Sequence, residues 1–337
     1  MPAYKDDKGK WYCKFYYTDY SGIKKQKKNA GFTLRKEALA WERDFIENHS
    51  AVNNDISFDT LLKKYLVDVK ERTRAATYER KESMAKKHVF GVFDCPASEV
   101  TPLAVKEWQY TLKNKGLAPN TIRAITTFLS SVFNWGISFC GLSNNPVKVA
   151  KHVVSKAKTE YNILTRERYD SLEFSRPSYK VLFDVLFYTG MRLGECLALT
   201  VGDVDGIYIS ITKSKGKHGV SPPKTQNSVR KVPMPGFLAK EVEEYIKALY
   251  GADPETFLFP FCRVTVAREL SRALEKKNYP KMRIHDLRHS HASLMIELGC
   301  NILLVAERLG DTPNTALSIY SHLYPDKQES FVEMIEK

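Results

Sequence analysis

Residues 285–292 read HDLRHSHA, and this octet decides what kind of fold and site the C-terminal part of the chain contains. In a helix, His285, Arg288 and His289 would share one face, because positions three and four apart are neighbours on the helix surface. The octet could belong to a metal site, to a site that binds phosphate, or to a plain polar helix face. Each alternative implies a different protein.

The arginine within the octet favours the phosphate-binding alternative. The spacing of His285 and His289 resembles the zinc motif HExxH, with Asp286 in place of the glutamate, but no third histidine follows at the expected spacing. A cation beside the ligands would oppose a divalent metal, whereas a phosphate site requires one. A phosphate site that includes Arg288 and His285, without a metal or another cofactor, is therefore favoured, and a plain polar helix face remains the alternative. His289 and His291 are expected to be packing or supporting polar groups.

The composition of the chain agrees with an anionic partner. The 337 residues carry a net charge of +13, which favours a polyanion, most often nucleic acid. The N-terminus MPAYKDDKGKWYCKF has charges where a signal peptide needs an apolar core, and no apolar run is long enough to cross a membrane. The six cysteines are scattered without a CxxC pair, as is typical of reduced thiols. These features predict a cytoplasmic protein of two or three domains with no membrane partner.

Residues 1–50 predict a small unit made of a β-hairpin or sheet plus a helix. WYCKFYYTD (11–19) and KKQKKNAGF (24–32) have the composition of strands joined by a turn, and a helix capped by Thr33 is expected to follow. Lysines alternate with aromatic residues here, which suits a sheet face that lies on a phosphate backbone. The residues predicted to bind DNA in this unit are Lys14, Lys24, Lys25, Lys27 and Lys28.

Residues 56–147 predict a bundle of four or five amphipathic helices, one of them ending at Gly116. The polar faces of these helices are basic. The residues predicted to contact DNA in this bundle are Lys63, Lys64, Arg72, Arg74, Lys86 and Lys87. The stretch that follows, NPVKVAKHVVSKAKTEYN (145–162), is predicted to be a basic linker.

Residues 160–337 predict a mixed, mainly helical unit. SYKVLFDVLFYTG (178–190) is apolar nearly all round, which indicates a buried helix that ends near Gly190. Residues 204–234 alternate like strands around polar turns and predict a small antiparallel sheet.

Three further side chains of this part could carry chemistry. Arg192 follows the buried helix, and Glu195 could hold its guanidinium while the other edge of that group faces a phosphate. Lys224 in PPKTQNSVRKVPM (222–234) would alone be an ordinary surface lysine. Tyr320 would alone be an ordinary packed tyrosine. Lys224 and Tyr320 become candidate functional residues only in the context of the other motifs of the chain.

Taken together, these motifs resemble the tyrosine recombinase (phage integrase) family. They occur in the order TGMRLGE with Arg192, PKTQNSVR with Lys224, HDLRH with His285 and Arg288, LGD at 309–311, and IYSHL with Tyr320. The resemblance covers the whole chain, and residues 1–50 are similar to the arm-site domains of integrases from conjugative transposons and temperate phages. It implies a multidomain α+β fold: a small β-sheet-plus-helix arm-binding domain (1–50), an all-α core-binding bundle (56–147), and a mixed, mainly α catalytic domain with a small antiparallel sheet (160–337).

The resemblance also implies a role for each residue of the site. Tyr320 would be the nucleophile that forms a 3′-phosphotyrosyl bond, which conserves bond energy without ATP. Arg192 and Arg288 would stabilise charge on the non-bridging oxygens, at roughly 3–4 kcal/mol for one lost donor. Lys224 would protonate the 5′-oxygen leaving group, and His285 would assist by hydrogen bonding and proton transfer.

One position departs from the family pattern. The family has His or Trp after the LG, and this chain has Asp311, which we count with the catalytic residues. A carboxylate beside a phosphate is unfavourable unless it accepts from a neighbour, so Asp311 is expected to bind His285, Arg288 or the region of Tyr320. Lower activity and a tolerated variant are the alternatives. Glu195 would support the site by orienting Arg192.

The implied activity is a site-specific DNA recombinase that integrates and excises a mobile element through a Holliday junction. Its partners would be double-stranded DNA at core-type and arm-type sites, an excisionase, a DNA-bending host factor, and further copies of itself in a dimer or tetramer in the bacterial nucleoid. The C-terminal SHLYPDKQESFVEMIEK (321–337) is predicted to contain a short helix exchanged between protomers. A topoisomerase-like enzyme and a DNA-binding protein without catalysis remain alternatives.

Overall fold

The computed structural model of the chain describes residues 3–7, 9–18, 24–50, 56–155, 157, 161–223 and 228–321. The chain divides into two compact units, residues 1–158 and 159–337. In the described part of the chain, no helix is long and apolar enough to cross a membrane. Lys224, the predicted turn at 20–22 and the predicted C-terminal helix lie outside the described residues. The boundaries of the three domains stay a prediction.

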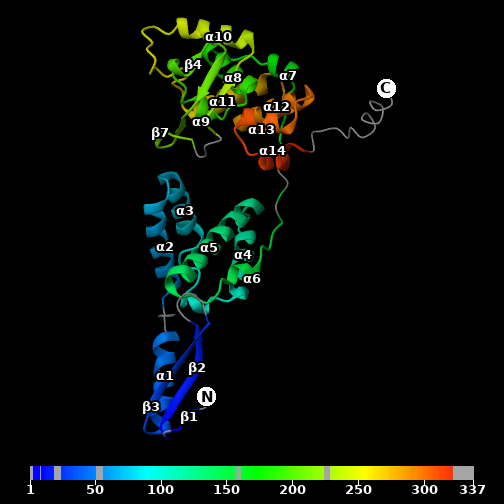
Figure 1. Ribbon diagram of the computed structural model, residues 1–337. Coiled ribbons are helices and arrows are strands. Elements are labelled where there is room, and N and C mark those ends of the chain that lie inside the picture. The colour runs from blue at the N-terminus through cyan, green and yellow to red at the C-terminus, as the bar shows by residue number, and fades with distance from the viewer. Residues whose placement is uncertain are drawn as a thin grey trace, which may run out of the picture. The chain divides into compact units, whose positions relative to one another are not determined.

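The first unit begins with a three-stranded antiparallel sheet in the order β1-β2-β3, with one helix beside it (Figure 1). Its elements are β1 (Tyr4–Lys5), β2 (Trp11–Thr18), β3 (Lys24–Phe32) and α1 (Arg35–Ser50). The two longer strands confirm the sequence prediction, which missed the short first strand. The helix begins at Arg35, two residues after the predicted cap Thr33, and the Glu37 carboxylate accepts hydrogen bonds from the amides of Thr33 and Leu34.

Helix α1 covers one face of this sheet through aromatic contacts. The ring of Phe15 on β2 lies 6.2 Å from the ring of Trp41 and 5.5 Å from that of Phe45, both on α1. Side chains alternate along a strand, so Lys14 points to the opposite, open face. Lys28 is directly opposite Lys14 on β3 and shares that open face.

A helical bundle completes the first unit, as predicted. Its elements are α2 (Phe58–Arg72), α3 (Ala75–His88), η1 (Ala97–Glu99), α4 (Pro102–Asn114), α5 (Pro119–Cys140) and α6 (Pro146–Ala150). Gly116 follows α4 with a φ of +75°, a conformation that glycine adopts without steric cost. Phe58, Tyr65 and Phe133 are fully buried in the core. Burying a side chain of this size stabilises the fold by about 1.5–3 kcal/mol.

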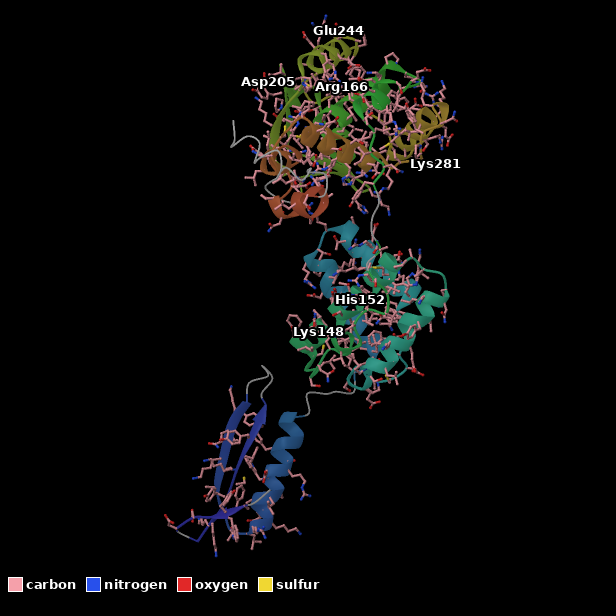
Figure 2. All side chains as sticks on the ribbon, turned by 90° about the vertical axis from the view of Figure 1, so that its right-hand side faces the viewer. Lys148, His152, Arg166, Asp205, Glu244 and Lys281 are labelled. Atoms are coloured by element: carbon pink, nitrogen blue, oxygen red, sulfur yellow. The ribbon has the colours of Figure 1, made fainter. Side chains whose placement is uncertain are left out.

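The prediction of a linker from residue 145 onward was wrong for its first residues. The Asn145 side chain caps α6 and its amide nitrogen donates to the Ser130 carbonyl and to Asn134 Oδ1, while Val147 is buried in the bundle core. Lys148 lies on the exposed side of this helix (Figure 2). The periodicity of a five-residue helix is too short to detect in a basic stretch, so only its packing reveals it.

The second unit is mainly helical with two small antiparallel sheets, ordered β4-β5-β8 and β6-β7. Its elements are α7 (Arg166–Asp170), α8 (Pro177–Thr189), α9 (Leu193–Cys196), η2 (Val201–Asp203), β4 (Val204–Asp205), β5 (Tyr208–Ile211), β6 (Ser214–Gly216), β7 (Gly219–Ser221), β8 (Arg230–Pro233), α10 (Gly236–Lys247), α11 (Arg263–Lys276), α12 (Ile284–Glu297), α13 (Ile302–Leu309) and α14 (Pro313–Tyr320). The predicted fold class, with a small antiparallel sheet in this part, is confirmed.

Helix α8 is the centre of the second core and fixes the position of the site. Its residues from Val181 to Thr189 are all buried, as the sequence predicted. The helix ends at Gly190, whose φ is +68°. A Cβ at this position would lie 2.5 Å from Cδ2 of His291 and 2.7 Å from Leu309. Glycine is therefore required both by the backbone conformation and by the close approach of α12 and α13.

Candidate active site

Arg192 is held at the junction between α8 and α9. It is the residue before the first turn of α9, and its backbone is extended, with φ −75° and ψ 146°. Glu195 in that turn accepts a hydrogen bond from the Arg192 amide at 3.0 Å and another from Nη1 at 2.8 Å. The predicted pairing of the two residues is present, although Arg192 precedes the helix.

Glu195 also binds a second arginine. Arg230 on β8 donates from Nη2 to Glu195 Oε2 at 3.0 Å, and both side chains are buried. Burial alone would raise the pKa of Glu195, but Arg230, the Arg192 amide and the Arg192 guanidinium together lower it below its usual value. The carboxylate is therefore ionised and links two cations from two different elements.

Asp311 joins the two arginines that the family resemblance assigned to phosphate. Its Oδ1 accepts from Arg192 Nη2 at 2.5 Å, and its Oδ2 accepts from Arg288 Nη2 at 2.5 Å. Asp311 therefore binds Arg288, one of the partners expected from the sequence. It also binds Arg192, which the sequence did not indicate as a partner. Asp311 follows the left-handed Gly310 at the end of α13, which turns the chain back toward α12.

Together these groups form a chain of alternating charge: Arg230, Glu195, Arg192, Asp311, Arg288. Three cations and two anions leave one net positive charge. Such pairs in a partly buried setting fix the guanidinium planes more firmly than they add stability, because desolvation offsets much of the attraction. The arrangement supplies preorganised donors for an anion.

Arg288 lies at the buried end of this chain, on α12. Only 3% of its side chain is exposed, and Nη1 donates to the Gly190 carbonyl at 3.0 Å. Burial and the nearby Arg192 lower the pKa of Arg288, while Asp311 opposes the shift. The guanidinium remains cationic because its ordinary pKa is so high.

Tyr320 is the last residue of α14 and is 2% exposed. Its hydroxyl lies 2.8 Å from Nδ1 of His289. Burial raises the pKa of Tyr320 to about 12, with Asp311 adding to the shift and Arg288 opposing it. The phenol is therefore neutral at pH 7. The hydroxyl of Tyr320, the predicted nucleophile, lies against α12, the helix that also carries Arg288.

The two neighbouring histidines have different surroundings. The His285 ring is exposed and packs edge-on against the His289 ring, with centroids 4.9 Å apart. Partial desolvation and the cations Arg288 and Arg192 lower the pKa of His285. His289, predicted to be a packing or supporting polar group, lies within hydrogen-bond distance of the Tyr320 hydroxyl, a partner that the sequence did not indicate.

His291 has the supporting role that the sequence suggested. It is buried, and its Nε2 accepts from Arg308 Nε at 2.9 Å. Burial, with a smaller effect of Arg308, lowers the pKa of His291 to about 3, so the ring is neutral. Arg308 also donates to the carbonyls of Tyr188 and Pro233 and so ties α13 to α8 and β8.

A cleft of about 590 Å³ opens beside the arginine cluster. It is lined by Arg192 and His285 and by two arginines that sequence reasoning did not single out, Arg263 and Arg283. Arg283 precedes α12, and its side chain pairs with Asp286 at 2.7 Å. No motif marks either residue, so only the fold could reveal them. Among the described residues, no group of His, Cys, Asp and Glu could hold a metal ion.

The predicted DNA-binding side chains in the first unit are exposed where they are described. Lys14 and Lys28 lie on the open face of the sheet, and Lys28 Nζ stands 4.5 Å from the centre of the Tyr12 ring. Lys27 lies on the other face, where its Nζ is 5.6 Å from the centre of the Phe45 ring of α1. In the bundle, Arg72 pairs with Asp68 and Lys86 pairs with Glu82, and both basic side chains remain largely exposed.

Comparison with known proteins identifies the family. The model of the phage integrase family matches residues 158–327, that of an arm DNA-binding domain matches residues 2–49, and that of the phage integrase N-terminal SAM-like domain matches residues 57–113. The ICEBs1 integrase of Bacillus subtilis (strain 168) is 28% identical over 90% of this chain and 90% of that protein.

The fold is shared with solved structures, among them those of two integrases. One is the Tn1549 transposon integrase in complex with transposon right end DNA, with 24% identity and a TM-score of 0.71 over 84% of this chain and 100% of that one. The other is a lambda integrase dimer bound to a COC′ core site, with 19% identity and a TM-score of 0.62 over 97% and 96%. The family model matches half of the chain and includes the whole arginine and tyrosine cluster. The chain belongs to the phage integrase family and is a tyrosine recombinase.

Proposed function

We propose that the chain is a site-specific recombinase that integrates and excises a mobile element through a 3′-phosphotyrosyl intermediate and a Holliday junction. The observation that carries the proposal is the convergence of Arg192, Arg288 and Tyr320 on Asp311 and His289, from four separate elements. No single motif predicts that convergence. A phosphodiester in this cluster would meet a nucleophile and two fixed guanidinium groups together.

The chemistry follows from where charge develops. Attack by the Tyr320 oxygen on phosphorus places negative charge on the non-bridging oxygens. Arg192 and Arg288 are already held in place by Glu195, Asp311 and the Gly190 carbonyl, so they need little reorganisation as the charge appears. Both arginines have further N–H groups beyond these bonds, because a guanidinium carries five.

The leaving group needs a proton, and the resemblance assigns that role to Lys224. His285 is the described residue that would assist it, since it is exposed and lines the cleft beside Arg192. The lowered pKa of His285 keeps its ring largely neutral at pH 7, so it can both donate and accept a hydrogen bond.

We assign Asp311 a positioning role. Its carboxylate takes one N–H from each phosphate-binding arginine and holds the two guanidinium groups a fixed distance apart. This use explains how a carboxylate is tolerated beside a phosphate: its charge is already matched by two cations. The net positive charge of the cluster remains for the DNA.

The sheet and the bundle of the first unit are the proposed DNA-binding surfaces. Lysines on the open face of the sheet, Lys14 and Lys28, are suited to phosphates at arm-type sites, with Tyr12 beside them. The basic residues of α2 and α3 are suited to core-type sites. They are Lys63, Lys64, Arg72, Arg74, Lys86 and Lys87.

Self-assembly is the remaining part of the proposal. An apolar groove of about 1350 Å³ runs along α12 and α13, where Leu298 and Leu303 are 74% and 60% exposed. The sequence after Tyr320 carries Phe331, Val332, Met334 and Ile335 at helical spacing. We assign this groove to the C-terminal segment of a neighbouring copy, which would bury those side chains and couple activity to assembly on DNA.

Trapping on a nicked suicide DNA substrate tests the function. The expected result is a covalent protein–DNA complex whose modified residue maps to Tyr320 and which Tyr320→Phe does not form. If the wild-type chain forms no complex with cognate element ends, the alternative of a DNA-binding protein without catalysis would be favoured. Relaxation of plasmids that lack attachment sites, as the main activity, would instead favour the topoisomerase alternative.

A further inference from the structure

The hydrogen bond between Tyr320 and His289 is the contact that the proposed roles leave unexplained. The Tyr320 hydroxyl lies 2.8 Å from His289 Nδ1, inside the buried part of the site. Among the described residues, no hydrogen bond joins Tyr320 to His285, the histidine to which the family resemblance assigns proton transfer. Within the described part of the chain, His289 is therefore the group that can take the Tyr320 proton without a change in side-chain position.

We propose that His289 is the general base of the reaction and accepts the phenolic proton of Tyr320 as that oxygen attacks phosphorus. This inference rests on the proposed function and deepens it. The other histidine, His285, then works on the leaving-group side with Lys224. The two histidines of one helix turn divide the two proton transfers of the reaction between them.

The fold holds the His289 ring in the orientation that this role needs. The Tyr161 ring lies against it at a centroid distance of 4.0 Å, and the His285 ring meets it edge-on at 4.9 Å. Only 3% of His289 is exposed, so bulk water does not compete for Nδ1. A ring fixed by packing on two sides loses little entropy when it accepts the proton.

The charges around His289 keep the ring neutral before the reaction. The groups that face it are His285, Arg283, Asp286 and Arg288 of its own helix and turn, Tyr161 from the segment before α7, and Tyr320 from α14. Burial lowers the pKa of His289 to about 4, with His285 and the two arginines adding to the shift and Asp286 opposing it. A neutral imidazole with its proton on Nε2 leaves the Nδ1 lone pair for the phenol.

The same surroundings prevent early ionisation of the nucleophile. Burial raises the pKa of Tyr320 to about 12, far above that of His289, so the pair stays neutral in the resting site. Bond formation to phosphorus removes electron density from the phenolic oxygen and makes its proton strongly acidic. The proton then moves to Nδ1, where the negative charge of the transition state stabilises the imidazolium.

The step balances without any added reagent. The Tyr320 Oη–H bond breaks, the proton forms an N–H bond at His289 Nδ1, and the O–P bond forms. The P–O5′ bond breaks and the 5′-oxygen takes a proton from the proposed acid Lys224. In ligation the 5′-hydroxyl attacks phosphorus and its proton returns to Lys224, while the bond from phosphorus to the tyrosyl oxygen breaks and His289 returns its proton to that oxygen. No group is oxidised or reduced.

The test compares His289→Asn with His285→Asn on two suicide substrates. Asn fills most of the imidazole space but cannot accept a proton, so His289→Asn should slow covalent trapping about 10²–10⁴-fold. A substrate with sulfur in place of the bridging 5′-oxygen has a leaving group that needs no proton. With that substrate, the trapping rate of His285→Asn should be largely restored, whereas trapping by His289→Asn should stay slow. Replacement of Tyr320 by a fluorinated, more acidic tyrosine should partly restore His289→Asn.

Several outcomes would overturn the inference. Trapping by His289→Asn at the wild-type rate would show that the reaction does not need His289, and rescue by the sulfur substrate would place His289 on the leaving-group side. No gain from the fluorinated tyrosine would show that His289 only holds Tyr320 in place. Core-site binding and the melting temperature of each variant establish that it is folded. If His289→Asn does not fold, ¹⁵N spectra of wild-type protein with labelled histidine show which ring nitrogen of His289 carries the proton. A proton on Nε2 supports His289 as the general base, and a proton on Nδ1 contradicts it. Loss of all trapping by the wild-type chain would instead contradict the proposed function.

Discussion

Under the proposed function, the arginine cluster of the second unit and the lysine-bearing sheet of the first unit would bind phosphate in two different ways. In the cluster, Arg288 is 3% exposed. Carboxylates and a backbone carbonyl hold the guanidinium groups of Arg192 and Arg288 in fixed planes. On the sheet, Lys14 and Lys28 are exposed on flexible stems. Chemistry at one phosphorus atom needs donors that are already oriented, whereas binding along a backbone needs only charge that can adjust. The contrast predicts that catalysis is lost through geometry and arm binding through charge.

Among changes to the charged groups of the cluster and the sheet, the largest effect should come from Arg288→Lys. This change keeps the charge but loses the planar fork that binds the Gly190 carbonyl and Asp311 together. We expect the rate of covalent trapping to fall about 10²–10³-fold. Arg272→Lys is the control, because Arg272 is also held by a carboxylate, Glu269, but does not line the cleft beside Arg192. Equal losses in the two variants would mean that stability, not phosphate geometry, explains the result.

A second effect should come from Glu195→Gln, which leaves Arg192 and the buried Arg230 without their shared charge partner. We expect a loss of about 3 kcal/mol in the free energy of unfolding and about 10–100-fold slower trapping. Chemical denaturation and the trapping assay measure the two effects.

The same variant should also change the dependence of stability on pH. The pKa of Glu195 is lowered in the fold, so its contribution is complete above the unfolded carboxyl pKa of about 4.3 and is lost as pH falls through the lowered value. Unfolding of the wild-type chain should therefore be more acid-sensitive than that of Glu195→Gln over this range. An identical acid response in both proteins would argue against an ionised Glu195.

A smaller effect should come from Asp311→Asn. The amide can still bind one of the two arginines, but it loses the charge and the second acceptor oxygen that hold Arg192 and Arg288 together. We expect trapping about 10-fold slower with little change in core-site affinity. Faster trapping in this variant would show that the carboxylate competes with the DNA phosphate and does not position the arginines.

The smallest effect on catalysis should come from the sheet. Replacing Lys14 and Lys28 with Ala should weaken binding to arm-type sites and reduce the salt slope by about two, because two phosphate contacts are lost. Cleavage of a short core site should not change. Lys25 and Lys27 are the matched pair: they carry equal charge but lie opposite Tyr17 and Phe15, on the face that α1 covers. Replacing Lys25 and Lys27 with Ala should reduce the salt slope of arm-site binding less than replacing Lys14 and Lys28. Equal slopes from both pairs would show that net charge, not the open face, governs arm binding.

Much of the architecture follows from the sequence. The strands at 11–18 and 24–32, the bundle helix that ends before Gly116 and the buried helix ending at Gly190 all follow from local periodicity and composition. The motif order around Arg192, His285, Arg288 and Tyr320 was sufficient to predict the family. Short elements were missed, because β1 and α6 are too brief to show a period and exist only through the contacts they make.

What the tertiary structure decided is which groups touch. The sequence determined that two arginines, a tyrosine and an unusual aspartate are present, because residue type and spacing along one helix are local properties. It did not determine that Asp311 bridges Arg192 and Arg288, since these residues lie on three different elements, with Arg192 119 positions and Arg288 23 positions from Asp311 in the sequence. Nor did it distinguish His285 from His289, because both lie on one helix and only the packing of α14 selects the ring that meets Tyr320. Helical spacing fixes the face on which a side chain lies, whereas the partner on the other side of the site depends on how distant elements pack.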